Sequence, residues 1–320
     1  MCKIARINRH FLSLRERISS SFLDESITNV IFYRRIRMNR IKLQKMLQEF
    51  LIEDIGELDI TSETIFPLEN KGNGVFIAKE NGIISGLDVI KEAYHLLDSS
   101  IEVKLRFSDG DRVAVGDTIA KVSGPIAHLL TGERVILNLM QRMSGIATVT
   151  NACVEALNDT SIQICDTRKT VPGLRMLDKY AVVTGGGKNH RQGLYDGVMI
   201  KDNHIAFCGS ITKAVQAVRE KIGHMVKIEV ETESKEEVLE AVEAGADVIM
   251  FDNRSPEEVK EFATLVPKTI VTEASGGITL DNLASYSGTG VNNISLGFLT
   301  HSVKALDISL QVKEGNKKDI

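Results

Sequence analysis

The sequence predicts an α/β protein in which a small α+β sandwich precedes a β/α barrel of six or seven strands. After Leu157, short apolar runs alternate with helical patterns, as expected of parallel strands joined by right-handed crossovers. Charged residues end successive runs, and a barrel gathers all such ends at one pocket, whereas an open sheet gathers only those at a switch point. These residues are Asp166, Lys201, Glu231, Asp252 and Glu273.

The first third of the chain has mixed patterns. Apolar residues at helical spacing predict a helix over 41–55 that ends at Gly56, and residues 59–62 are expected to form a polar turn. Alternating apolar and polar residues predict short strands, with a helix over 87–97 among them. The strands are expected at 74–79, 83–86, 101–107 and 118–123.

Longer elements follow. Helical spacing over 132–143 leads through Ser144-Gly145 into a second helical run that reaches about Leu157. Barrel strands are expected at 162–166, 197–201, 226–231, 247–252, 270–274 and 291–296. Helical patterns between the later strands cover 210–221, 234–244, 255–264 and 279–286.

Composition narrows the class of protein. With 320 residues and 43% hydrophobic content, the chain can bury a large core and is long enough for two domains. No apolar run approaches the roughly 20 residues that span a membrane, so we expect a cytoplasmic protein. The cysteines are far apart and form no CxxC pair, which predicts neither disulfides nor a thiolate zinc site. They are Cys2, Cys153, Cys165 and Cys208.

The net charge of -4 hides an uneven distribution. Residues 1–40 contain nine Lys or Arg against three acids, which leaves the remainder near -10. An acidic body suits a small anionic ligand in a local cationic pocket better than an extended nucleic-acid track. Residues 1–37 are interpreted either as a targeting or interaction arm or as a dispensable, disordered extension ahead of a start at Met38. We favour the second interpretation.

A cationic stretch runs from Asp166 to His204. Short apolar runs interleave its cations, as expected if strand ends and turns aim them at one pocket for a ligand with several negative charges. The cations are Arg168, Lys169, Arg175, Lys188, His190, Arg191, Lys201 and His204, around Gly185-Gly186-Gly187. His190 is interpreted as a hydrogen-bond donor to that ligand. For His204, a ligand contact and a structural role remain equally open.

Two glycine turns are candidates for phosphate binding. Ser275-Gly276-Gly277 precedes the helix expected at Thr279, and Ser295-Leu296-Gly297 precedes a helix expected after His301. Backbone N–H groups at such turns approach phosphate oxygens, and the loops after the last two strands of a barrel commonly hold phosphate.

Three acids and one arginine complete the candidate site. Glu229 and Glu231 alternate on one face of their strand, and with Asp252 they could bind ribose hydroxyls, hold a divalent metal or stabilise positive charge. The alternative is a structural ion-pair network. Arg134 lies in the first turn of a helix and opposes its dipole, which indicates an anionic partner or a surface salt bridge.

The chain resembles one known family through many motifs in a fixed order. They are EDIGELDITSE, GERVILNLMQRMSGIAT, DTRKTVPGLR, GGGKNHR, VMIKDNH, IEVE, AGADVIMFDN, EASGGI and SLGFLTHS. By these motifs the chain resembles quinolinate phosphoribosyltransferase, the carboxylating nicotinate-nucleotide pyrophosphorylase, from about residue 41 to 312. The resemblance implies conversion of quinolinate and phosphoribosyl pyrophosphate to nicotinate mononucleotide, diphosphate and CO2 in NAD biosynthesis. Residues 1–37 match nothing in the family pattern.

The resemblance also implies an architecture. An N-terminal sandwich domain, 38–146, to which 303–320 could add, would join an incomplete α/β barrel, 147–302. The family forms a homodimer with a shared active site, and larger assemblies are left open. Its reaction uses Mg²⁺ and no organic cofactor.

Carried over by motif, the site would consist of three groups. Lys169, Lys201, Glu231 and Asp252 would be catalytic, with Glu231 and Asp252 facing the ribose and Mg²⁺, although Glu229 remains an alternative to Glu231. Arg168, Lys169, Arg175, His190, Arg191 and Lys201 would bind quinolinate and diphosphate, with Arg134 contributed by the partner subunit. Ser275, Gly276, Gly277, Gly297 and His301 would bind the 5-phosphate.

Two alternatives remain. A related phosphoribosyltransferase could use another pyridine carboxylate, such as nicotinate, or belong to a molybdenum-transport cluster. The extra carboxylate of quinolinate requires extra cations, and the presence of Arg134, Arg168, His190 and Arg191 favours quinolinate. A non-catalytic anion-binding protein on the same scaffold would be expected to lack one of the four catalytic residues.

Overall fold

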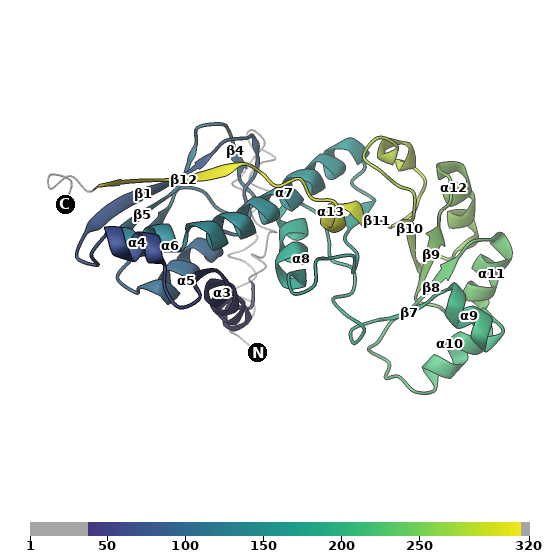
Figure 1. The fold of residues 1–320 in the computed structure, drawn as a ribbon. Helices are drawn as coiled ribbons and strands as arrows, with labels where there is room; N and C mark the ends of the chain where they lie inside the picture. Colours follow the sequence, from purple (N-terminus) through teal and green to yellow (C-terminus); the bar gives the residue numbers. More distant parts are fainter. Residues whose placement is uncertain (1–37, 315–320) are drawn as a thin grey trace, which may run out of the picture. The chain divides into compact units, whose positions relative to one another are not determined.

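The N-terminal part is built on an antiparallel sheet of order β12-β1-β5-β3, seen in Figure 1 in the computed structural model, which describes residues 38–314. The predictions for residues 1–37 lie outside the described residues. The strands are β1 (Lys71–Ala78), β3 (Glu102–Leu105), β5 (Thr118–Pro125) and β12 (Ile308–Glu314). Burial alternates along β1, as expected of a sheet with one face against a core.

Helices α3 (Arg40–Ile55), α5 (Leu87–Leu97) and α6 (Ile126–Thr131) accompany this sheet, so the predicted sandwich and its first helix are present. The helix α3 ends at Gly56, whose φ of 60° suits a glycine. The expected polar turn at 59–62 is wrong. Asp59 accepts a hydrogen bond from the Ser62 N–H at 2.9 Å and thereby caps α4 (Ile60–Ile65). The short pair β2 (Gly82–Ile83) and β4 (Arg112–Val113) forms a separate sheet.

A single helix, α7 (Glu133–Leu157), connects the two parts of residues 38–314 (Figure 1). The sequence suggested two helical runs separated at Ser144-Gly145, but the helix is continuous. Gly145 is required there because a Cβ at this position would lie 2.2 Å from the Lys304 carbonyl oxygen. The expected domain boundary between residues 146 and 147 therefore lies inside one helix.

The second part is an incomplete α/β barrel, as predicted. Its parallel sheet has the order β6-β11-β10-β9-β8-β7, and β6 and β7 do not pair with each other. The strands are β6 (Gln163–Cys165), β7 (Val198–Ile200), β8 (Ile228–Thr232), β9 (Val248–Asp252), β10 (Val271–Ser275) and β11 (Asn293–Ser295). The helices are α8 (Arg175–Thr184), α9 (Asp202–Cys208), α10 (Ile211–Arg219), α11 (Lys235–Glu243) and α12 (Pro256–Leu265).

Some elements differ from the prediction. The helix expected over 279–286 is only a 3-10 turn, η1 (Leu283–Tyr286), because Asn282 bonds the Thr279 N–H and the Gly277 carbonyl in a polar turn. Helix α13 (Phe298–His301) follows Gly297 directly instead of beginning after His301. Helices α8 and α9 lie in the cationic stretch, for which strand ends and turns were expected.

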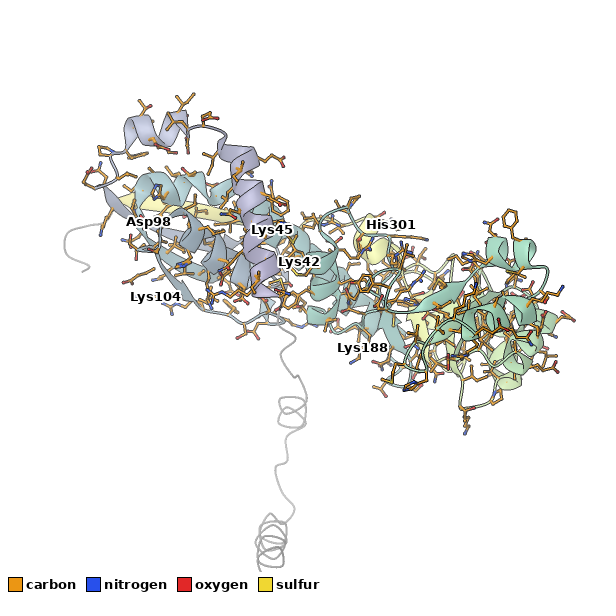
Figure 2. All side chains as sticks on the ribbon, turned by 90° about the horizontal axis from the view of Figure 1, so that it is seen from below. Lys42, Lys45, Asp98, Lys104, Lys188 and His301 are labelled. Carbon is orange, nitrogen blue, oxygen red and sulfur yellow. The ribbon has the colours of Figure 1, made fainter. Side chains whose placement is uncertain are left out.

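One cluster of buried apolar side chains extends from α3 through α7 to the barrel strands. Side chains of both parts are drawn in Figure 2, with Lys42 and Lys45 on α3 and with Lys188 and His301 toward the barrel. No helix between residues 38 and 314 has the length and apolar character that a membrane crossing requires.

Candidate active site

The acids of β8, β9 and β10 lie on one face of the parallel sheet. Glu231 and Glu273 both align with Met250, one on each side, and Asp252 aligns with Ser275 one row further along. Because side chains alternate between faces, Glu229 shares the face of Glu231. The carboxyl ends of these strands therefore carry a group of acids at the barrel mouth, as the sequence predicted.

Lys201 and Glu231 form an ion pair at the strand ends. Their side chains are 45% and 12% exposed, so the pair can be reached by a ligand. Nearby, the Asn253 amide donates to Asp252 Oδ2 at 2.7 Å. Burial and the negative charge of Glu231 raise the pKa of Asp252. Two carboxylates that oppose each other's ionisation suit a cation between them, and oxygen ligands suit Mg²⁺.

Deeper in the barrel, His190 meets two buried acids. Its Nε2 lies 2.9 Å from Glu229 Oε2 and 3.7 Å from Glu273 Oε1. Burial and the charge of Glu229 raise the pKa of Glu273 to about 7. In the described part of the chain, these three residues form the group that could offer three ligand atoms to a metal. Glu229 is buried against His190, so Glu231 is the acid available to a ligand at the mouth.

Both ring nitrogens of His190 are engaged within the protein. Nδ1 accepts the Arg191 N–H at 2.7 Å, while Nε2 faces Glu229. Burial alone would lower the pKa of His190, but the hydrogen bond to Glu229 and the charges of both acids raise it. Donation from His190 to a ligand, as predicted, therefore requires the ring to exchange Glu229 for that ligand.

Arg168 and Arg191 are cations that form no ion pair among residues 38–314. Arg168 Nε is buried there without a hydrogen-bond partner. The guanidinium of Arg191 donates to the Gly197 carbonyl at 2.9 Å. Burial and the nearby charge of Arg168 lower the pKa of Arg191. Two neighbouring, partly buried guanidinium groups favour binding of an anion, and a carboxylate matches their geometry.

The two glycine turns lie side by side at the end of the sheet. Ser275 pairs in register with Ser295, and its hydroxyl donates to the Ser295 carbonyl at 3.4 Å. A Cβ on Gly297 would lie 3.0 Å from Lys169 Cδ and 3.2 Å from His301 Cδ2. The structure thus brings Lys169 and His301 to the second turn.

Left-handed backbone shapes the first turn. Gly276 and Gly277 have φ of 80° and 66°. A Cβ on Gly276 would also collide with Asn253 Oδ1 at 2.4 Å, so this turn packs against the residue after Asp252. No α-helix begins directly after this turn, since the next helical element is the 3-10 turn η1.

Three predicted residues lie outside the central group or have protein partners. Arg175 begins α8, and its guanidinium donates to Thr170 Oγ1 at 3.1 Å and to the Gln192 carbonyl at 3.3 Å. His204 Nδ1 accepts the Lys201 N–H at 3.0 Å and caps α9, which favours the structural interpretation. Arg134 is exposed in the first turn of α7.

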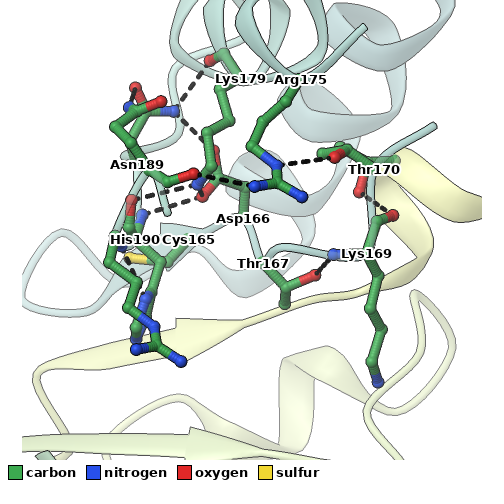
Figure 3. Close-up of polar contacts among 12 residues, drawn as sticks. Cys165, Asp166, Thr167, Lys169, Thr170, Arg175, Lys179, Asn189 and His190 are labelled. Atoms are coloured by element: carbon green, nitrogen blue, oxygen red, sulfur yellow. Dashed lines mark hydrogen bonds and ion pairs between the residues drawn. The ribbon is translucent and has the colours of Figure 1, made fainter. Parts of the chain in front are cut away.

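The sequence interpretation did not assign a role to three polar residues that the structure places next to His190. Figure 3 shows Asp166, Lys179 and Asn189 in one hydrogen-bonded group. Asp166 was recognised as a strand-end residue, which was a usable signal. Lys179 lies on α8, which was not predicted, so its sequence position indicated nothing.

The fold and site together define an incomplete α/β barrel whose mouth gathers cations, acids and two glycine turns. Residues 59–144 match the model for the N-terminal domain of quinolinate phosphoribosyl transferase, and residues 146–311 match its C-terminal domain. The chain belongs to the quinolinate phosphoribosyltransferase family.

Individual relatives agree. A probable nicotinate-nucleotide pyrophosphorylase [carboxylating] of Bacillus subtilis is 58% identical over 88% of this chain and 96% of its own. A quinolinate phosphoribosyltransferase [decarboxylating] of Nicotiana glauca is 42% identical over 84% of this chain and 82% of its own. The crystal structure of NadC from Streptococcus pyogenes aligns with a TM-score of 0.85 at 39% identity, covering 88% of this chain and 99% of that one.

Proposed function

We propose that the protein transfers the phosphoribosyl group of phosphoribosyl pyrophosphate to quinolinate, forming nicotinate mononucleotide, diphosphate and CO2. Family membership supports the reaction, and one structural observation carries the substrate. Arg168 and Arg191 adjoin each other at the barrel mouth without acidic partners in the described chain. A dicarboxylate supplies two negative groups to such a pair, whereas a monocarboxylate would leave one cation uncompensated. We place the enzyme in the cytoplasm, as a prediction.

The phosphate groups of the second substrate fit the other side of the mouth. The 5-phosphate would lie against the backbone of Ser275, Gly276 and Gly277, with Gly297 and His301 adjoining. The hydrogen bond between the two turns and the closeness of Lys169 to Gly297 support this placement. Lys169 and Lys201 would then face the diphosphate, and Arg175 would lie at the edge of the pocket.

Glu231 and Asp252 fit a magnesium ion. Mg²⁺ usually binds proteins through one or two carboxylates and keeps waters or substrate phosphates as its other ligands. The raised pKa of Asp252, caused by burial and by Glu231, supports a cation at this position. When bound there, Mg²⁺ would neutralise charge on the diphosphate.

The protein groups act on the transfer of the phosphoribosyl group, which comes before the loss of CO2. The pyridine nitrogen attacks ribose C1, and the bond from C1 to the diphosphate oxygen breaks as positive charge develops on the ribose. Glu231 and Asp252 face this positive charge, while Lys169 and Lys201 stabilise the charge that leaves with the diphosphate. The bond from the ring to the adjacent carboxylate then breaks as CO2 departs, the positive pyridinium nitrogen stabilises the electron pair left on that ring carbon, and a proton bonds to the carbon.

The reaction is tested by incubation with phosphoribosyl pyrophosphate and Mg²⁺, with either quinolinate or nicotinate as acceptor. Release of CO2 from carboxyl-labelled quinolinate, with equal formation of nicotinate mononucleotide, is expected. Arg168→Met should raise the quinolinate KM by about tenfold to a hundredfold, because one charge-assisted hydrogen bond is lost. Turnover of nicotinate without turnover of quinolinate would contradict the proposal.

We further propose a homodimer in which Arg134 enters the site of the partner subunit. The side chain of Arg134 is exposed and joins no ion pair within residues 38–314. It lines a pocket together with Leu58 and Ile60. Exposed apolar side chains lie on α3, on α4 and between these two helices. Ile52, Leu58, Ile60 and Ile65 are 67%, 48%, 73% and 60% exposed. Such a patch is typical of a surface that a protein partner covers.

Mixed dimers test this arrangement. Arg134→Ala and Lys201→Ala should each be nearly inactive, but hybrids should regain activity, because one of the two sites then contains neither substitution. Subunit exchange is confirmed with two different affinity tags. If exchanged hybrids stay inactive, Arg134 does not act across the interface.

A further inference from the structure

The open edge of the barrel is filled by a short segment without regular structure. Lys188 makes a single parallel bridge to Cys165 of β6, through Lys188 N to Ile164 O at 2.8 Å and Asp166 N to Lys188 O at 3.1 Å. β6 has no other neighbour on this edge in the described structure. The segment 188–191 therefore occupies the place of a missing strand, and it carries His190 and Arg191.

A buried ion pair fixes this segment. The side chains of Lys179 and Asp166 are 1% and 0% exposed and bond to each other. Lys179 Nζ also donates to the His190 carbonyl at 3.1 Å, and Asp166 Oδ1 accepts the His190 N–H at 2.9 Å. Both backbone polar groups of His190 are thus held by the pair (Figure 3).

Asn189 completes the group. Its amide donates to Asp166 Oδ2 at 2.5 Å and to the Lys179 carbonyl at 2.9 Å. Unlike the pair, Asn189 is exposed. Because the Lys179 side chain is only 1% exposed, no substrate can reach it. The residues whose backbone the pair holds border the pocket.

Stability alone does not explain a buried pair of this kind. Removing two charges from water is costly, and apolar replacements of buried pairs are often neutral or stabilising. A buried pair is better suited to specifying one conformation of a segment that lacks the hydrogen bonds of a full strand. Here that conformation determines where the side chains of His190 and Arg191 lie.

We propose that Asp166 and Lys179 are positioning residues that fix the backbone at His190 and thereby aim His190 and Arg191 at quinolinate. The inference rests on the proposed function for the role of Arg191. The phosphate side of the mouth is built from β10, β11 and α13, which the pair does not contact through any hydrogen bond in the described structure. Disturbing the pair should therefore affect one substrate more than the other.

The test replaces the pair by neutral side chains of similar volume, Asp166→Asn with Lys179→Met. We expect the quinolinate KM to rise about tenfold, while the KM for phosphoribosyl pyrophosphate changes less than about threefold. The milder Asn189→Ala, at an exposed position, should fold and raise the quinolinate KM in the same direction. Parallel changes in both KM values, or an unchanged quinolinate KM in either folded variant, would overturn the proposal.

Two controls separate the possible failures. Arg142→Met with Asp178→Asn neutralises a second ion pair that includes α8. This pair bonds to the Val171 N–H, which an amide oxygen at position 178 can still accept, and makes no hydrogen bond to 188–191. It should leave the quinolinate KM within about threefold of wild type. Arg191→Met should raise that KM by itself. If it does not, the proposed substrate site is wrong, and the proposal that the pair aims Arg191 at quinolinate is overturned with it.

Discussion

Removing only one partner of the ion pair between Arg142 and Asp178 should destabilise the protein strongly, because Asp178 is buried. Arg142 Nε and Nη2 each donate to one oxygen of Asp178 at 2.8 Å, and Nη2 also donates to the Thr300 carbonyl at 2.8 Å. The Asp178 side chain is 0% exposed. These contacts join α8 and α13 of the barrel to α7, the helix that connects the barrel to the N-terminal part.

Substitution of Arg142 by Met leaves the Asp178 carboxylate buried without its cation. Breaking a buried pair in this way costs about 3 to 5 kcal/mol in the free energy of unfolding. The matched control is Arg112→Met, since Arg112 also pairs with a residue of α7, Glu155, but with side chains 66% and 60% exposed. That change should cost less than about 1 kcal/mol.

Urea denaturation of both variants and the wild type, at one protein concentration, measures the difference. The double variant Arg142→Met with Asp178→Asn should recover most of the lost free energy of unfolding, because no unpaired carboxylate is then buried. Equal losses in Arg142→Met and Arg112→Met would refute the reasoning. So would a double variant as unstable as Arg142→Met alone.

Three further outcomes are expected. Gly276→Ala should be inactive and much less stable than the control Gly116→Ala. Both glycines have a left-handed φ, but only a Cβ at position 276 would lie within 3 Å of another atom, Asn253 Oδ1. Equal behaviour of the two variants in melting and turnover assays would contradict this reasoning. Asn253→Gly should keep the free energy of unfolding within about 1 kcal/mol of wild type, because glycine adopts the φ of 54° without strain. It should lower kcat severalfold, because the hydrogen bond that holds the Asp252 carboxylate is lost. A loss of activity that only follows the melting temperature would contradict the role of Asn253 in positioning Asp252. Burial raises the pKa of Glu273 to about 7, so only the native state keeps this proton between its ordinary 4.5 and 7, and stability falls as pH rises through that window. Glu273→Gln removes this titration and should gain stability relative to wild type over the same window; a pH-independent difference in denaturation midpoints would contradict the assignment.

Much of the barrel could be predicted from local patterns. Apolar runs marked each strand from β6 to β11 because buried parallel strands are nearly continuous in apolar residues. Helical patterns predicted α10 to α12, and the predicted ranges begin at the serines that cap these helices: Ser210, Ser234 and Ser255. Strands are short enough that their ends could be assigned to the correct residue or nearly so, which placed Glu231 and Asp252 at the mouth.

Other elements could not be predicted, because distant contacts decide them. Gly145 looked like a helix break, but the close approach of Lys304 explains it inside a continuous α7. Helix α8 was missed because its polar positions, Asp178 and Lys179, are buried in ion pairs and do not follow an amphipathic pattern. From the sequence pattern alone, buried charged residues of this kind are predicted to lie on the protein surface.

By itself the sequence determined the family, the α/β class and the chemical character of the site, because residue types fix charge and the strand pattern fixes which ends carry it. Only the tertiary structure decided which cations are left for a ligand. Lys179 is paired with Asp166 and Lys201 with Glu231, whereas Arg168 and Arg191 form no ion pair in the described chain. The physical reason is that the residue type sets the charge of a side chain, whereas the partner that neutralises this charge lies far away in the sequence and is brought close only by folding.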